Sequence, residues 1–214
     1  VFILTSCCLA WLVALPLWMM DAGSGSYGIM FSLLAQAMMF TPAIAVLVVV
    51  FLMKVPGTRR ARFLGMWPLR PAKRVVWFMV FATLVPLLIV ALITAVAALL
   101  HLVDLDLVTF RGFQDMLAAQ VANTGSGSTS LPAVEVLVVT QLLSIPFAAL
   151  LNSFFAFGEE VGWRGWLLPA LLPFGTWPAL IVSGVVWGLW HSPLVLLGYN
   201  FGYTDIRGVL LMTA

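Results

Sequence analysis

Long apolar runs recur along the chain, and they constrain its fold more than any other feature. Each is about 20 residues long, the length that an α-helix needs to cross the hydrocarbon core of a bilayer. Backbone polar groups in lipid must be bonded within a helix or around a closed barrel, and these runs lack the polar alternation of barrel strands. Hydrophobic residues make up 63% of the chain, and its mean hydropathy of +1.13 lies outside the range of soluble domains. The sequence therefore predicts an all-α, polytopic transmembrane helix bundle.

The apolar runs predict at least five crossings. They cover residues 1–20, 28–53, 75–100, 133–157 and about 177–197. Pro42 predicts a kink in the second run, which neighbouring helices can accommodate. A further apolar run starts at Gly208, and the chain begins with Val1 and stops at Ala214, so we expect a fragment of a longer protein. We interpret residues 1–214 as a single transmembrane helical domain whose motif-bearing core covers 133–197.

The polar connections set the expected orientation. Residues 54–74 contain no acid and carry seven of the ten basic residues of the chain: Lys54, Arg59, Arg60, Arg62, Arg70, Lys73 and Arg74. Such an excess marks a cytoplasmic loop that contacts anionic lipid headgroups, and it explains the charge without nucleic acid as a partner. The next connection, 101–132, is then outside. It is either a short helix on the membrane surface or a disordered loop, and its end at 123–130 is expected to be a flexible linker.

The segment Gly-Glu-Glu-Val-Gly-Trp-Arg-Gly, residues 158–165, concentrates charge in a chain with only 8% charged residues. Charges in a membrane-spanning region are costly and usually face a partner or a water-filled cavity. Glu160 and Arg164 are four residues apart, on one helix face and in the favourable order for an ion pair. Glu159 projects in another direction without that partner, which suits a general base. The alternative is a structural ion pair that locks two helices together.

His191 is the histidine inside a predicted crossing, in the segment Trp-Gly-Leu-Trp-His-Ser-Pro, residues 187–193. It is either a hydrogen-bonded core residue or a partner of Glu159 that activates water or binds a metal. A divalent metal such as zinc takes three or four protein ligands, whereas these segments offer two carboxylates and one histidine. Glu159 and His191 are the candidate metal ligands, and a metal-free mechanism fits equally well. The neighbouring tryptophans, including Trp187, are interpreted mostly as packing residues or interfacial anchors.

Two motifs resemble the CPBP intramembrane proteases, which include type II CaaX prenyl endopeptidases and bacterial relatives linked to bacteriocin self-immunity. They are Glu-Glu-x-x-x-Arg at 159–164 and aromatic-x-x-x-His at 187–191. The resemblance is specific over about 155–197. It implies an endopeptidase in which Glu159 and His191 activate the attacking water, while Glu160 and Arg164 hold the site in shape.

The chain departs from the family pattern at two places. Trp187 stands where the family usually has Phe, which we expect to be a mild change. The family's third motif, a later His followed by Asn, is absent from 198–214. In the family that pair helps to stabilise the oxyanion. Either the motif lies beyond Ala214, which we expect, or the protein is inactive.

The leading functional hypothesis is a multi-pass endopeptidase in the cell membrane of a bacterium. Its expected partners are membrane lipid and a membrane-associated peptide or protein, with prenylated CaaX tails among the candidates. The alternative is a non-catalytic membrane protein, either a peptide-binding immunity protein or a transporter that uses Glu159 and His191 as a proton relay. The protease hypothesis requires that Glu159 lie inside the bundle, close to His191 and reachable from the cytosol.

Overall fold

The computed structural model describes residues 1–106, 108–124 and 133–213, and all regular elements in these ranges are helical. Within them, four helical stretches are long and apolar enough to cross a membrane. Their bounds are Phe2–Met19, Tyr27–Leu52, Ala72–Leu99 and Val134–Phe174. The prediction of an all-α transmembrane protein is confirmed.

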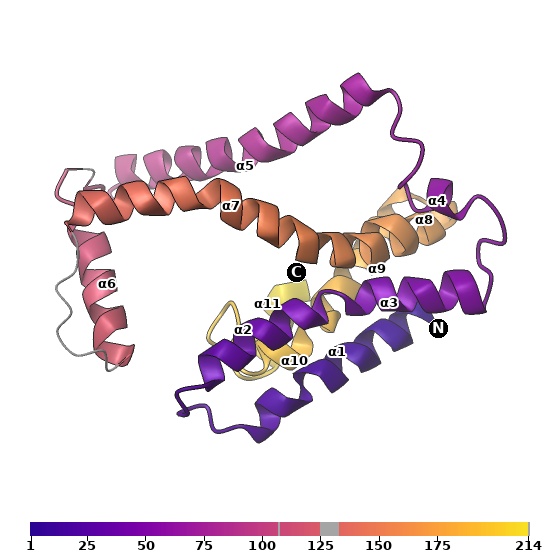
Figure 1. The fold of residues 1–214 in the computed structure, drawn as a ribbon, viewed down its shortest axis with the longest axis horizontal. Helices are drawn as coiled ribbons and strands as arrows, with labels where there is room; N and C mark the ends of the chain where they lie inside the picture. The colour runs from indigo at the N-terminus through magenta and orange to yellow at the C-terminus, as the bar shows by residue number, and fades with distance from the viewer. Residues whose placement is uncertain (107, 125–132, 214) are drawn as a thin grey trace. The chain divides into compact units, whose positions relative to one another are not determined.

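The chain divides into two compact units (Figure 1). The first unit consists of residues 1–69 and 150–214, and the second of residues 70–149. The interpretation of residues 1–214 as one domain stays a prediction. Most of the expected linker at 123–130 lies outside the described residues.

The first unit begins with α1 (Phe2–Met19), which packs against α2 (Tyr27–Met38) and α3 (Thr41–Leu47) (Figure 1). A π-helix, η1 (Val48–Leu52), and the short α4 (Arg60–Phe63) follow. The buried stripe of α1 recurs every three or four residues and consists of Phe2, Ser6, Ala10, Ala14 and Leu17. Its central residues are small, which lets neighbouring helices approach closely. Met39 and Phe40 separate α2 from α3, and Pro42 lies in the first turn of α3, where the sequence predicts a kink.

The charged segment lies on one long helical stretch. Its α-helical part is α7 (Val134–Glu160), which continues as a π-helix, η2 (Val161–Leu167), then as α8 (Leu168–Leu171) and a 3₁₀ turn, η3 (Leu172–Phe174). The change from α-helix to π-helix falls immediately after the two acids. Single π-helical turns are rare and often occur at functional sites. Residues 150–160 of α7 belong to the first unit, together with η2.

The expected fifth crossing, 177–197, is interrupted at His191. Only α9 (Thr176–Trp190) is a long helix here, and α10 (Ser192–Val195) and α11 (Ile206–Thr213) follow. With 15 residues, α9 is about 22 Å long, shorter than the roughly 30 Å of a bilayer core. Pro193 explains the interruption, because it has no N–H for a helical hydrogen bond and disfavours helical geometry at the residue before it.

Glycines let the acid-bearing helix approach the α2–α3 junction. A Cβ added at Gly158 would lie 2.6 Å from Phe40 Cδ1 and 3.2 Å from the Met39 carbonyl oxygen. A Cβ added at Gly162 would overlap Pro42. The two glycines lie on either side of Glu159 and allow its helix to pack closely against residues 39–42.

Replacing Gly162 by Ala is expected to destabilise the fold by about 1–3 kcal/mol, because the backbone of Pro42 cannot yield to the added methyl group. The free energy of unfolding in detergent micelles, measured by denaturant titration, checks this. Gly28→Ala is the matched control, since a Cβ at Gly28 meets no atom within 4 Å. Equal stability of the two variants would contradict the close approach.

The second unit contains α5 (Ala72–Leu99), α6 (Arg111–Thr124) and the first part of α7. The structure favours the helical alternative for the connection after α5, although its position on a membrane surface stays a prediction. Asp106 bonds to residues at the N-terminus of α6. Its carboxylate accepts hydrogen bonds from the Thr109 hydroxyl, from the Thr109 backbone N–H at 2.7 Å and from the Arg111 backbone N–H at 3.2 Å. These bonds hold the pKa of the Asp106 carboxyl well below its usual range.

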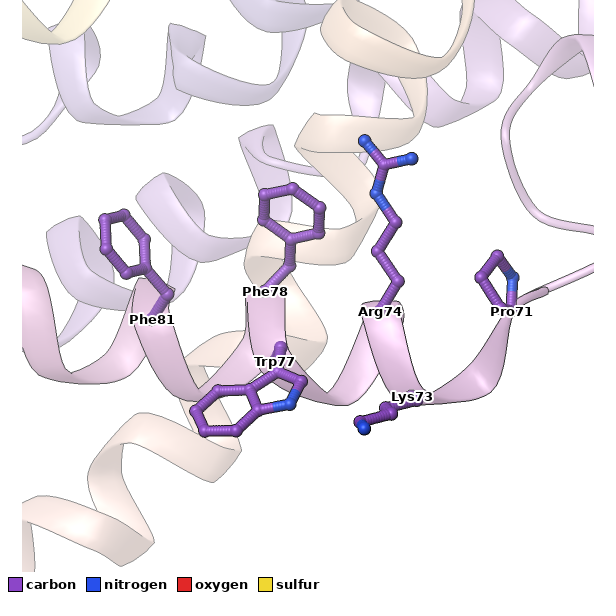
Figure 2. Close-up of a pocket in the computed structure, with 6 residues that line it drawn as sticks. All are labelled: Pro71, Lys73, Arg74, Trp77, Phe78 and Phe81. Carbon is purple, nitrogen blue, oxygen red and sulfur yellow. The ribbon is translucent and has the colours of Figure 1, made fainter.

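The first turns of α5 combine basic and aromatic side chains (Figure 2). Arg74, Phe78 and Phe81 project from the same side of the helix, and Trp77 from the other. The Arg74 guanidinium carbon lies 5.5 Å from the centre of the Phe78 ring. Such a band is typical of a helix end at a membrane–water interface.

Candidate active site

The two adjacent acids of α7 have different surroundings. Glu159 is buried, with 8% of its surface exposed. Glu160 accepts a 2.8 Å ion-pair contact from the Arg164 Nη1 atom, and about half of each of these two side chains is exposed. The expected pairing is therefore present, and protein atoms leave about half of it uncovered. The buried acid is Glu159, since a helix rotates successive residues by about 100°.

Trp187 of α9 contacts the acid-bearing helix at two points. Its indole Nε1–H donates a hydrogen bond to Glu159 Oε1. The guanidinium carbon of Arg164 lies 5.7 Å from the centre of the Trp187 ring, within the range of a cation–π contact. Trp187 thus links the buried acid and the arginine that pairs with its neighbour.

His191 lies directly after α9, where the helix ends. Its backbone N–H bonds to the Gly188 carbonyl at 3.1 Å, so the Trp187 carbonyl is left for the side chain. The His191 Nδ1 atom lies 2.8 Å from that carbonyl oxygen. A carbonyl oxygen only accepts, so Nδ1 carries the hydrogen, and Nε2 of the neutral ring has a free lone pair.

Aromatic rings hold His191 in place. The rings of Trp187 and Trp190 each lie 4.6 Å from the imidazole and nearly perpendicular to it. Trp190 is buried, packs against Trp163 at 5.7 Å, and donates its indole N–H to Thr41 Oγ1 at 3.0 Å. The histidine therefore packs on the buried core, which is formed by helices from both ends of the chain.

Glu159 and His191 line the same cavity, which has a volume of about 300 Å³. It lies within the first unit, between residues of α2, α7, α9 and α10. Three further polar side chains line it, from Ser32, Gln36 and Asn152. The rest of its lining is mostly apolar or aromatic: Phe31, Ala35, Met38, Met39, Trp190, Leu194 and Tyr199. Asn152 reaches the same space as Glu159, two helical turns earlier, as its spacing predicts.

The described residues do not complete a zinc site. Across 1–106, 108–124 and 133–213, no group of three His, Cys, Asp or Glu side chains lies close enough to hold a metal ion. A catalytic zinc site takes three protein ligands, whereas the cavity offers Glu159 and His191.

The fold and the cavity define a helical integral membrane protein with a buried acid and a histidine facing one internal space. Residues 139–214 match the model of the family described as type II CAAX prenyl endopeptidase Rce1-like. This match includes both motifs and supports the CPBP or CAAX protease family that they indicated.

A curated relative supports the same family. It is a CAAX prenyl protease 2 of Methanococcus maripaludis, 32% identical over a stretch that covers 34% of this chain and 34% of the relative. The match thus spans about a third of the length of that relative. No solved structure matches the chain.

The sequence does not reveal the role of Trp187. The interpretation of the tryptophans as mostly packing residues or interfacial anchors agrees with the buried positions of Trp163 and Trp190. Trp187 instead donates to Glu159, so its difference from Phe is chemical as well as steric. Two features of the sequence could have indicated this hydrogen bond. Trp187 lies four residues before His191, which places both on one face of a helix, and a buried indole N–H needs a hydrogen-bond acceptor.

Proposed function

We propose that this protein is an intramembrane endopeptidase that hydrolyses peptide bonds of membrane-associated substrates. One observation carries the proposal: Glu159 and His191, which come from different helices, line one cavity. Paired groups of this kind can bind a water molecule and take up its proton. The family match and the curated relative, itself a prenyl protease by name, support the same reaction class.

The proposed reaction uses a water molecule held between Glu159 and His191. The Glu159 carboxylate accepts a proton from the water as its oxygen attacks the carbonyl carbon of the scissile bond. The unprotonated Nε2 of His191 accepts the second water hydrogen in a hydrogen bond and orients the attacking oxygen. When the tetrahedral intermediate collapses, the C–N bond breaks, and Glu159 returns the proton to the leaving amine.

Glu160 and Arg164 support this site from outside the cavity. Their ion pair spans the start of η2, and Arg164 also lies against Trp187. In this proposal they hold the helix geometry that presents Glu159 and do not contact the reacting atoms. The apolar and aromatic lining of the cavity favours a substrate that enters from lipid, and a prenylated CaaX-type tail is the proposed class. Whether the membrane is that of a bacterium stays a prediction.

A cleavage assay tests the function. The purified full-length protein, in lipid vesicles, would be mixed with CaaX peptides that carry a prenyl group and with the same peptides without it. Mass spectrometry would identify the new termini, and reactions in ¹⁸O-labelled water would show the label in the new carboxyl group. A Glu159→Ala/His191→Ala double variant serves as the inactive control, and parallel reactions with and without chelator report on metal.

We expect the wild type to cleave the peptides and the double variant not to, with faster cleavage of the prenylated peptides than of the peptides without the prenyl group. Equal cleavage with and without the prenyl group would remove the proposed substrate class but keep the peptidase. Tight binding of the peptides without any hydrolysis would favour the peptide-binding alternative. Proton movement across the vesicle membrane without hydrolysis would favour a transporter.

A further inference from the structure

Trp187 contacts the two central groups of the cavity through different atoms. Its indole N–H donates to Glu159 Oε1, and its backbone carbonyl accepts from His191 Nδ1. Its ring also lies edge-on to the imidazole and under the Arg164 guanidinium. Trp187 itself does not line the cavity that Glu159 and His191 share; it lines a neighbouring one of about 200 Å³, together with Arg164. Trp187 therefore supports the two groups from outside the cavity that they share.

The indole hydrogen bond makes the two carboxylate oxygens of Glu159 inequivalent. Oε1 is held by Trp187, while Oε2 receives no hydrogen bond from the described residues. A hydrogen bond to an ionised carboxylate is about twice as strong as one between neutral groups and fixes its direction. The carboxylate is thus anchored by one oxygen, and the other remains available to a ligand in the cavity.

The backbone carbonyl of Trp187 orients His191 in a similar way. This carbonyl does not accept the helical hydrogen bond of the His191 N–H, because that N–H bonds to the Gly188 carbonyl instead. A carbonyl that accepts from Nδ1 fixes both the tautomer and the orientation of an imidazole, as outer partners do in many sites. One residue thereby sets the direction of both groups.

We propose that Trp187 is a positioning residue that aims Glu159 Oε2 and His191 Nε2 into the same cavity. Phenylalanine would keep the ring and the backbone carbonyl but has no N–H, so the bond to Glu159 is particular to tryptophan at this position. The kinetic consequence rests on the proposed function, whereas the hydrogen bond itself can be tested without any substrate.

The first test uses the indole N–H signals in the ¹⁵N NMR spectrum of the full-length protein in lipid nanodiscs. The signal absent from Trp187→Phe is assigned to Trp187. We expect it downfield in the wild type and shifted upfield in Glu159→Gln, because an amide oxygen is a weaker acceptor than a carboxylate. The Trp166 signal should not move, since its N–H lies 3.5 Å from the Val55 carbonyl, away from the cavity. A Trp187 signal that is the same in wild type and Glu159→Gln would overturn the proposal.

The second test is kinetic. Trp187→Phe is expected to lower kcat about tenfold with little change in KM, since Trp187 does not line the cavity and one hydrogen bond to a charged group is lost. Trp166→Phe, the same chemical change outside the site, should keep wild-type kcat. Wild-type kcat in Trp187→Phe would overturn the positioning role. If the NMR shift occurs but no variant cleaves any peptide, the hydrogen bond stands and the proposed function fails.

Discussion

Replacing Glu159 by Gln is expected to lower kcat for peptide cleavage by about 100- to 10,000-fold, the usual contribution of a general base. Gln has the same size, and its amide oxygen can still accept the Trp187 N–H, so the local structure should be kept. What it cannot do is take a proton from water. Initial rates with a membrane-anchored peptide, measured in vesicles beside the unfolding midpoint of each variant, check this prediction.

Glu160→Gln is the control for this variant, because it makes the same change one residue away. Glu160 is about half-exposed and pairs with Arg164, and pairs of this kind contribute about 0–1 kcal/mol. We expect this variant to lose at most about tenfold in kcat, through a loosened helix. The opposite result, with Glu160→Gln inactive and Glu159→Gln active, would show that Glu160 is the base and contradict the proposed assignment to Glu159.

The fold class follows from the sequence because its cause is local. Apolar length and the lack of polar alternation already require helices in lipid, and the break before Pro42 follows from a single residue. The interruption of the helix at His191 is harder to predict from the sequence than the break near Pro42. Hydropathy treats 177–197 as one run, whereas Pro193 removes the N–H that would continue the helix.

The site was predicted to the extent that helix periodicity determines it. The spacing of Glu160 and Arg164 specifies their pairing, and it leaves Glu159 on another face, where the structure buries it. Periodicity within one helix cannot show what a second helix presents to it. The contact of Trp187 with Glu159 joins residues 28 positions apart, and it depends on how α9 packs on η2. The close approach of Gly162 to Pro42 likewise depends on how two separate helices pack.

Replacing His191 by Phe is expected to lower kcat by about 100-fold or more, without loss of the fold. Phenylalanine keeps an aromatic ring between Trp187 and Trp190, so the packing on both faces is retained. It removes Nε2, which in the proposed reaction orients the water, and Nδ1, which bonds to the Trp187 carbonyl. The measurement is the same vesicle assay, with kcat and KM determined separately.

His191→Ala separates the nitrogen from the packing. It opens space beside a cavity of about 300 Å³, so added imidazole can enter and place a nitrogen near Glu159. We expect a concentration-dependent, partial recovery of cleavage with imidazole in His191→Ala, and none in His191→Phe, where the ring fills the space. Recovery in neither variant, with both folded and His191→Phe as active as the wild type, would mean that His191 is a packing residue. The water would then be activated by Glu159 without it.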